Sequence, residues 1–472
     1  MYRPRITALA LALAWTGALA WTPGIALAQS STELEEIRKE IQNVKDSYEK
    51  RIEELEARLK QAEESAQRAQ ETAQRAEQQA QSAAAAAPVT SAAPSQNAFN
   101  PGISLILQGA YRNYSEDPDT RGISGYAPAG GAGLGEKGFS INESELTLSA
   151  SVDQLFYGQA TFAVEDEAIE VEEAYAQTSA LGHGLTLKGG RAFSGIGYQN
   201  SLHPHAWDFL DPALAQNVFL GPNYAMDSLS ASWIAPLPLF AEVGGEIGRP
   251  VEFPFEDSSH SKNGFTGGTL FARLGGDIGT SHSYRVGGWW MRAENRTDEG
   301  TPILDFDDRT GVANTLAGGD TEVWGLDLVY KWTPEGNPTR RNFKLVAEWM
   351  QRRLDGVLTY DSGGAGVNDA FEAKQSGWYI QGVYQFIPQW RLGLRYDRLD
   401  DGSISAGINE ANGITAAGYS PYRWSAMVDW SPSEFSRLRL QYNQDKSQEG
   451  LTDNQVFLQY IFSLGAHGAH KF

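Results

Sequence analysis

Residues 390–397 have the sequence WRLGLRYD, in which apolar side chains alternate with polar or small ones. In an extended chain Trp390, Leu392 and Leu394 fall on one face, whereas Arg391 and Arg395 fall on the other. A period of two residues predicts a β-strand with one apolar and one polar face. Aromatic side chains at both ends of the apolar face are typical of a strand that meets lipid.

The same alternation recurs along the chain, and turns that are alternately short and long separate the segments. An even number of such strands, with tight turns at one end and long loops at the other, is the rhythm of an outer-membrane barrel. Because lipid tolerates no unpaired strand edge, the strands must close on themselves. We therefore expect an all-β transmembrane barrel of about 16 antiparallel strands with a water-filled lumen. The expected strands are 103–114, 139–152, 155–165, 169–179, 184–193, 226–234, 239–248, 265–277, 282–294, 321–333, 341–353, 375–386, 390–400, 421–431, 435–446 and 453–464.

The N-terminal residues predict export from the cytoplasm. Arg3 and Arg5 precede an apolar run, and Ala26-Leu27-Ala28 offers a small-x-small cleavage site. This pattern predicts a signal peptide over residues 1–28. The alternative, a membrane anchor, is disfavoured because residues 21–24 interrupt the apolar run and a spanning helix needs about 20 apolar residues.

Residues 29–81 predict a coiled-coil helix, because small or apolar side chains recur at alternating steps of three and four. A solitary charged helix is the alternative. Residues 82–102, rich in Ala, Pro and Ser, are interpreted as a linker, and 103–472 as the barrel. The coiled coil is placed in the periplasm, where it could trimerise the barrel, contact the cell wall, or both.

Composition limits the possible partners. The formal net charge of -21 makes nucleic acid an unsuitable partner, because nucleic-acid binding needs a basic surface. The chain contains no cysteine, which removes disulfide and thiolate chemistry. No G-x-S-x-G elbow or phosphate-binding loop occurs, so we expect neither an enzyme nor a cofactor.

Charged residues on the polar faces of the expected strands are the candidate pore lining, because channels sort ions by the placement of charge. The later strands supply a basic group, and the early strands supply an acidic group. We expect opposed walls that set a transverse field, although simple pairing and solvation of the lumen is the alternative. The basic group is Arg391, Arg395, Arg423, Arg437, Arg439, Lys344 and Arg352, and the acidic group is Glu143, Glu145, Glu170 and Glu172.

The longest-looking external loop, about residues 194–225, is the candidate constriction. Its aromatic, proline and apolar content predicts an ordered segment, and long ordered loops are usually functional. An external lid is the alternative. The residues expected to act at the constriction are His203, His205, Trp207, Asp208 and Asp211.

Histidines offer a second hypothesis for this loop. His203 and His205, with Asp208 nearby, are weak candidates for a metal such as zinc, since imidazole and carboxylate suit such ions. A structural His-Pro-His turn is the alternative. His467 and His470 lie near the carboxyl end and are expected on the periplasmic side, apart from the loop.

The chain resembles the phosphate-selective porin O/P superfamily. The resemblance runs through the segments VEEAYAQ at 171–177 and LTLKGGR at 185–191, after a signal peptide and a coiled coil. The loop HPHAWDF at 203–209 and the tail GAHGAH at 465–470 look like a branch labelled zinc-regulated outer-membrane receptor. The resemblance implies a porin of sixteen strands with a short periplasmic coiled coil. Phosphate selectivity is not implied, because residues 194–225 contain no Lys or Arg.

These observations together predict a passive Gram-negative outer-membrane channel for small hydrophilic solutes or ions, assembled as a homotrimer. Two alternatives stay open. The barrel could anchor a tether that reaches the cell wall through the coiled coil, or the channel could be linked to uptake of a metal such as zinc.

Overall fold

The computed structural model describes residues 101–118, 121–126, 135–165, 168–251, 264–294, 301–303 and 310–465, and four helical positions, Lys39, Gln42, Lys45 and Lys60. The chain divides into two units, Met1–Gln96 and Asn97–Phe472. The predicted signal peptide, the linker before residue 101, almost all of the predicted coiled coil, and His467 and His470 lie outside the described residues. No helix within the described ranges is long and apolar enough to cross a membrane.

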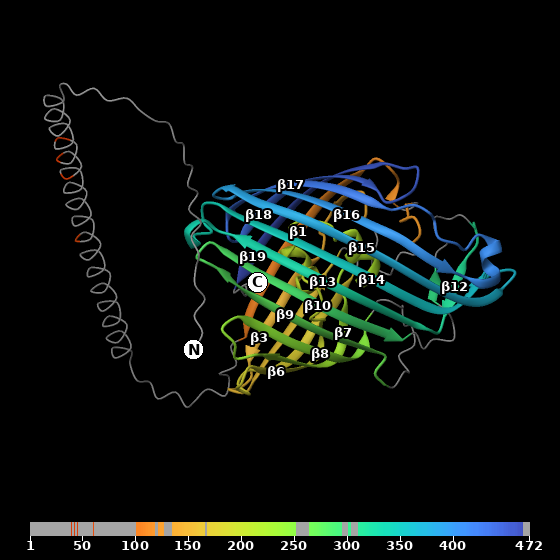
Figure 1. Ribbon diagram of the computed structural model, residues 1–472, viewed down its shortest axis with the longest axis horizontal. Coiled ribbons are helices and arrows are strands. Elements are labelled where there is room, and N and C mark those ends of the chain that lie inside the picture. The colour runs from red at the N-terminus through yellow and green to blue at the C-terminus, as the bar shows by residue number, and fades with distance from the viewer. Residues whose placement is uncertain are drawn as a thin grey trace, which may run out of the picture. The chain divides into compact units, whose positions relative to one another are not determined.

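Sixteen long antiparallel strands form the wall of the barrel, as Figure 1 shows. They are β1 (Gly102–Tyr114), β3 (Ser144–Ser151), β4 (Phe156–Val164), β5 (Ile169–Thr178), β6 (Leu185–Phe193), β7 (Ala225–Ile234), β8 (Phe240–Pro250), β9 (Gly267–Ile278), β10 (His282–Glu294), β13 (Asp320–Trp332), β14 (Asn342–Tyr360), β15 (Val367–Ile387), β16 (Trp390–Ser405), β17 (Tyr422–Ser433), β18 (Ser436–Lys446) and β19 (Asp453–Gly465). The short strands are β2 (Gly138–Ser140), β11 (Thr301–Ile303) and β12 (Asn314–Ala317).

Short helical turns occupy the connections. They are η2 (Gln199–Ser201), η3 (Pro204–Ala206), α2 (Leu214–Leu220), η5 (Pro334–Gly336) and η6 (Gly407–Asn412). The first three lie in the connection between β6 and β7.

The ring closes between its first and last strands. β1 pairs with β19 in a register that runs from Ser104 opposite Gly465 to Tyr114 opposite Gln455. Each of the other fifteen junctions joins two of these sixteen strands that follow one another along the chain. The predicted closed barrel of 16 antiparallel strands is confirmed.

The alternation seen in the sequence sorts side chains between lipid and lumen. On β16, Leu394 is 65% exposed whereas its neighbour Arg395 is 1% exposed. Trp424 of β17 is likewise exposed, and the adjacent Arg423 is buried. An outer face of exposed apolar side chains is stable only in contact with lipid or another apolar surface, so this is a transmembrane barrel.

Two predicted boundaries differ from the structure. The expected strand 139–152 is interrupted at residues 141–143, where β2 ends and β3 begins. The expected loop 354–374 shortens to residues 361–366, because β14 and β15 extend beyond the expected bounds. Their extensions bury a small apolar cluster made of Leu316, Leu358, Phe371, Ala373, Ala406 and Ile414. Burial of this cluster favours strand in a region whose Gly and Asp content predicts loop.

Candidate functional site

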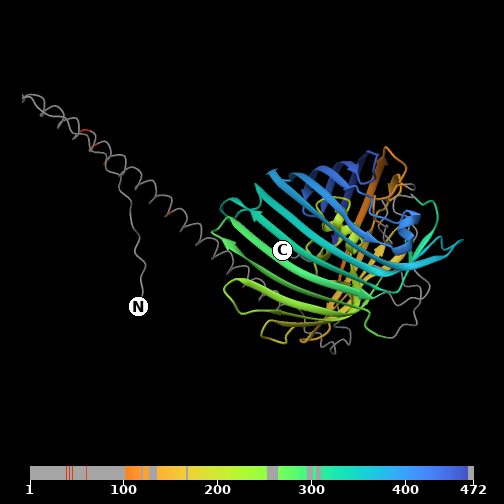
Figure 2. The same cartoon turned by 45° about the vertical axis from the view of Figure 1, so that its right-hand side comes forward.

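The connection between β6 and β7, residues 194–224, lies inside the ring of strands (Figure 2). We call it the third loop. Its two ends meet where the Ser194 amide donates to the Tyr224 carbonyl at 2.9 Å. Ile196 and Phe219 within it are completely buried. Side chains of the loop therefore pack against one another and against the barrel wall.

The helix α2 packs closely on the wall. Gly377 of β15 permits this approach, because a Cβ at that position would lie 3.1 Å from Phe219 and 3.2 Å from Ala215. Arg352 of β14 donates through Nη1 to the Val218 carbonyl at 3.0 Å, near the end of α2. This contact satisfies one of the carbonyls that a helix end leaves without a partner.

Glu348 of β14 holds the start of the loop. Its carboxylate accepts the backbone amides of Tyr198 at 2.7 Å and Gln199 at 3.1 Å, and the hydroxyl of Tyr379 also donates to it. Glu348 is only 2% exposed, so these donors replace the water that the carboxylate lost.

Asp208 joins the middle of the loop to the basic wall. Its Oδ2 lies 2.7 Å from Nζ of Lys344 on β14 and accepts a hydrogen bond from Gln381 at 3.0 Å, while Oδ1 lies 3.5 Å from Arg391. Burial alone would raise the pKa of this carboxyl, but Lys344 and Arg391 outweigh burial and lower the pKa of Asp208 to about 2. Asp208 is therefore ionised at neutral pH.

Asp211 makes a second junction with the same wall. Its carboxylate lies 2.8 Å from Arg423 of β17 and 3.1 Å from Arg395 of β16, and it accepts a hydrogen bond from Asn443 at 3.1 Å. Burial opposes ionisation, yet Arg423 and Arg395 lower the pKa of Asp211.

Backbone carbonyls of the loop also accept from the wall arginines. Arg395 donates to the Asp211 carbonyl at 2.9 Å, Arg423 to the Pro212 carbonyl at 2.6 Å, and Arg439 to the Trp207 carbonyl at 2.9 Å. A guanidinium group presents several donors in a fixed plane, so one arginine can hold both a carboxylate and a carbonyl.

Carboxylates of the wall itself also pair with the predicted basic residues. Arg391 lies 2.5 Å from Asp429, Arg395 lies 3.0 Å from Asp397, and Arg439 lies 3.7 Å from Asp429. The basic residues of β14 and β16–β18 therefore do not present a bare positive surface.

His203 and His205 contact the opposite, acidic side of the interior. Nδ1 of His203 lies 3.2 Å from Glu145 of β3 and 3.1 Å from Glu172 of β5, and Nε2 lies 3.1 Å from Glu173. Nδ1 of His205 lies 2.5 Å from the other oxygen of Glu145. The loop is thus held on two sides of the barrel by groups of opposite charge.

A bulge in β5 brings two successive glutamates to one imidazole. Thr161 of β4 pairs with Glu173, but the next residue, Phe162, pairs with Val171, so Glu172 is the extra residue. In a regular strand neighbouring side chains face opposite sides. A bulge redirects the extra side chain, and here both carboxylates face His203.

Glu173 is not among the pore-lining residues predicted from the sequence, although the sequence indicates that its side chain faces inward. The apolar residues Ile169 and Val171 occupy odd positions, whereas Ala174 and Ala176 occupy even ones. The change of phase between them marks the bulge. The prediction assumed strict alternation, placed Glu170 and Glu172 on the same inward face, and so overlooked the bulge.

Three predicted residues make no ion pair with the third loop in the described ranges of the chain, and of these Glu143 hydrogen-bonds to Glu172. Glu143 lies in the break between β2 and β3 rather than on a strand, and its buried Oε1 has no hydrogen-bond partner within the described part of the chain. Glu170 lies at the exposed start of β5. Arg437 of β18 is partly buried, and its Nε and Nη1 have no hydrogen-bond partner among the residues that the structure describes.

A cavity of about 450 Å³ borders the third loop on the side of β1 and β19. Trp207 and Asp211 line it from the loop, and Phe457 lines it from β19. Its charged lining residues are Arg112, Arg423, Glu136, Glu143, Glu165 and Asp211. Asp211 and Arg423 pair with each other, which leaves three acidic residues, Glu136, Glu143 and Glu165, against Arg112, so the lining is acidic.

The sequence matches no family model. An uncharacterized protein of Aquifex aeolicus (strain VF5) is 31% identical over 409 residues, which cover 80% of this chain and 81% of that protein.

Solved structures with similar topology have low sequence identity. OmpT of Vibrio cholerae, in its trimer form, has a TM-score of 0.47 and 10% identity and covers 77% of this chain and 99% of its own. The outer membrane channel DcaP of Acinetobacter baumannii has a TM-score of 0.47 and 12% identity, with 77% and 97% coverage. OprB of Pseudomonas putida has a TM-score of 0.46 and 14% identity, with 77% and 94% coverage. Likeness at this level carries no information on solute or mechanism.

A closed barrel of 16 strands, with an apolar outer face and a polar interior occupied by its third loop, defines a porin-like outer-membrane β-barrel. Within this class, the chain belongs to the same family as the uncharacterized protein of Aquifex aeolicus (strain VF5).

Proposed function

We propose that this protein is a passive outer-membrane channel for small hydrophilic solutes or ions, and not an enzyme, with the third loop as its constriction. The observation that supports the proposal is the attachment of one loop to two sides of a polar interior. Asp208 contacts Lys344 of β14, and His203 contacts Glu145 of β3. A segment fixed in this way narrows a water-filled barrel at a defined place.

We further propose that the channel favours cations. The basic residues of the wall are largely paired with Asp208, Asp211, Asp397 and Asp429, whereas the lining of the 450 Å³ cavity is acidic. Acidic groups raise the local concentration of cations in a narrow passage. The predicted wall of basic residues would favour anions instead, so a measurement of ion selectivity distinguishes a channel governed by the acidic lining from one governed by the basic wall.

The experiment is single-channel recording of the refolded full chain in planar bilayers, with reversal potentials measured across a KCl gradient. Stable open steps with a reversal potential of the cation-selective sign are expected. A correctly folded barrel that gives no steps would overturn the channel proposal. Open steps with the anion-selective sign would overturn the cation preference alone and favour a channel governed by the basic wall.

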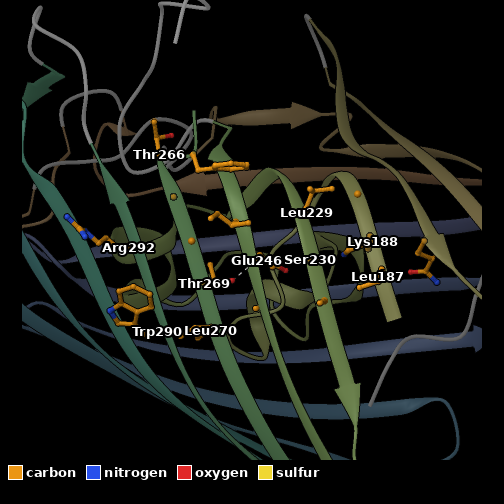
Figure 3. Close-up of a pocket in the computed structure, with 18 of the residues that line it drawn as sticks. Leu187, Lys188, Leu229, Ser230, Glu246, Thr266, Thr269, Leu270, Trp290 and Arg292 are labelled. Carbon is orange, nitrogen blue, oxygen red and sulfur yellow. Dashed lines mark hydrogen bonds between the residues drawn. The ribbon is translucent and has the colours of Figure 1, made fainter. Parts of the chain in front are cut away.

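The outer face of β5–β10 supports the proposed trimer. It carries a hollow of about 900 Å³ whose lining includes Leu229 of β7, Leu270 of β9 and Trp290 of β10 (Figure 3). Leu229 is 64% exposed, so the hollow faces outward. Ala231 and Gly245 also line it. We propose that a second copy of the chain covers this hollow in a homotrimer.

A bulky side chain in the hollow tests this interface. Ala231→Trp is expected to convert trimers to monomers in sedimentation measurements, and the matched change Ala426→Trp on the exposed outer face of β17 is expected to leave them intact. Trimers that survive Ala231→Trp would place the subunit interface elsewhere.

For the N-terminal unit we propose the boundaries predicted above: a signal peptide over 1–28, a periplasmic coiled coil over 29–81 and a linker over 82–102. Contact with the cell wall through this coiled coil is compatible with a conducting barrel. Removal of residues 29–81 is expected to leave single-channel steps unchanged. A loss of all conductance would show that the coiled coil is part of the pore.

A further inference from the structure

Five metal-binding side chains from three elements converge beside the third loop. They are Glu145 of β3, Glu172 and Glu173 of β5, and His203 and His205 of the loop. Ligand atoms of Glu145, Glu172 and His203 all lie within 4.8 Å of one another. The group is a mixed set of imidazoles and carboxylates inside the barrel, not a purely acidic surface patch.

The charges of this cluster are unbalanced. Two imidazoles carry at most two positive charges, and Lys188 near Glu173 adds a third. They face the carboxyl groups of Glu145, Glu172 and Glu173, with Glu143 close by. Glu145 is 2% exposed, so water does little to screen its charge. Glu143 adds a fourth carboxyl group, which hydrogen-bonds to Glu172, and its Oε1 is buried without a hydrogen-bond partner in the described part of the chain. A divalent cation among these oxygens would offset the excess.

The distances around His203 fit a small divalent cation. Nδ1 of His203 lies 3.2 Å from Glu145 Oε2 and 3.1 Å from Glu172 Oε2. Ligand atoms lie about 2 Å from a bound zinc ion, so in a tetrahedral site they are about 3.3 Å apart. The two distances from Nδ1 are thus already close to the spacing that such an ion requires, and the two carboxylate oxygens lie within 4.8 Å of each other.

The remaining two residues are placed to orient these ligands. Nε2 of His203 lies 3.1 Å from Glu173, so an Nε2–H donated to that carboxylate would leave Nδ1 free to bind a metal. His205 contacts the second oxygen of Glu145 at 2.5 Å. A carboxylate behind a histidine ligand is the usual outer partner of zinc sites, since it sets the tautomer and the ring orientation.

We propose that Glu145, Glu172 and His203 bind a divalent transition-metal ion of the zinc class, with Glu173 and His205 as positioning residues. One nitrogen and two carboxylate oxygens suit zinc better than calcium or magnesium, which take oxygen ligands. The ion joins the third loop to β3 and β5. It thereby fixes the loop against one wall, and its effect on conductance rests on the proposed channel function.

The test measures zinc binding by the full chain, refolded in detergent and freed of metal with a chelator, in competition with a chromophoric zinc chelator. One ion per chain is expected at this site. His203→Ala and Glu172→Gln are expected to remove it, and Glu173→Gln to weaken it by about 10- to 100-fold. Circular dichroism and heat-modified gel mobility confirm that each variant is folded.

Two control variants separate this site from other histidines. His183→Ala changes an exposed turn between β5 and β6, and the double variant His467→Ala with His470→Ala removes the two C-terminal histidines. Both are expected to retain the site. Absence of saturable zinc binding, or binding that His203→Ala and Glu172→Gln leave unchanged, would overturn the proposal.

Conductance distinguishes the failure of this site from the failure of the channel. Conducting protein that binds no zinc would remove the metal site and leave the channel. Protein that binds one zinc through His203 but never conducts would keep the site and remove the channel. If the metal site and the channel function are both correct, zinc should lower the conductance of the natural chain but not that of His203→Ala.

Discussion

Asp208 of the third loop and Lys344 of β14 form an ion pair of 2.7 Å inside the barrel, with 4% and 20% of their side chains exposed. They are 136 positions apart in the sequence, so the pair joins a loop to a distant strand. Because the partners are largely removed from water, breaking this pair should cost far more stability than breaking an ion pair on the protein surface.

Asp208→Asn should release the middle of the loop. The substitution removes the carboxylate that Lys344 pairs with and one of the two that Arg391 contacts, since Arg391 keeps Asp429. Loss of one partner of a buried pair costs about 3 kcal/mol. Urea unfolding in detergent micelles should show this loss, and single-channel conductance should rise. Asp277→Asn, the same change at an exposed position of β9, serves as the control and should alter neither quantity.

Acid should loosen the same junction over a defined pH range. The pKa of Asp208 is about 2 in the folded protein, below the value of about 3.9 for an unfolded chain. Its ionised form therefore stabilises the fold above about pH 4, and this contribution disappears as the pH falls toward 2. Asp211 also has a lowered pKa and titrates in the same direction. Conductance should rise over this range in the natural chain, whereas a double Asn variant at 208 and 211 should respond little.

Tyr379→Phe should weaken the start of the loop. The hydroxyl of Tyr379 donates to the buried carboxylate of Glu348, which also accepts the amides of Tyr198 and Gln199. Removing one donor from a buried carboxylate should cost about 1–3 kcal/mol in the free energy of unfolding. Tyr384→Phe changes a side chain that is 37% exposed on the same strand. Equal losses for the two variants would show that the Glu348 contact contributes nothing specific.

Deleting Glu172 should preserve the barrel. The deletion removes the extra residue of the bulge, so that Val171 and Ala174 face outward and Glu173 faces inward in one regular strand. Deleting Tyr175 instead leaves the bulge and shifts the paired residues that follow it. Refolding yield, read from heat-modified gel mobility, should stay high for the first deletion and fall for the second. The reverse order would contradict the register of β5.

Neutralising the exposed acids of the 450 Å³ cavity should reduce the preference for cations. Glu136 and Glu165 both line this cavity and are exposed, so Gln at both positions should alter selectivity without loss of folding. The reversal potential across a KCl gradient should shift toward the anion-selective sign. Glu335→Gln, in the exposed turn between β13 and β14, should leave it unchanged.

The strands could be predicted because the two faces of a transmembrane strand meet different solvents. Leu394 and Arg395 alternate in the sequence and lie on opposite sides of the wall, as expected. The extension of β14 and β15 could not be predicted in this way. The segments 354–360 and 367–374 lie beyond the expected strand bounds, and they are stabilised by contacts with Leu316 of β12 and Ile414, which are distant in the sequence.

The site was predictable only in part. The prediction of a functional third loop and of charged residues facing the interior rests on local sequence. Which charges meet depends on register and on the path of the loop, and the 2.8 Å contact of Asp211 with Arg423 has no local signal. Pairing of Arg391 with Asp429 likewise needs the alignment of β16 with β17.

The seam between β1 and β19 has a consequence for biogenesis. Residues 104–114 can find their partners on β19 only after residues 455–465 have been synthesised and delivered. Until then every partly assembled sheet presents two open edges, at which another chain can add. Closing the ring requires the contact that is most remote in the sequence, so it is expected to be the slow step of assembly. Shielding of those edges during export is therefore a requirement that this topology imposes on the cell.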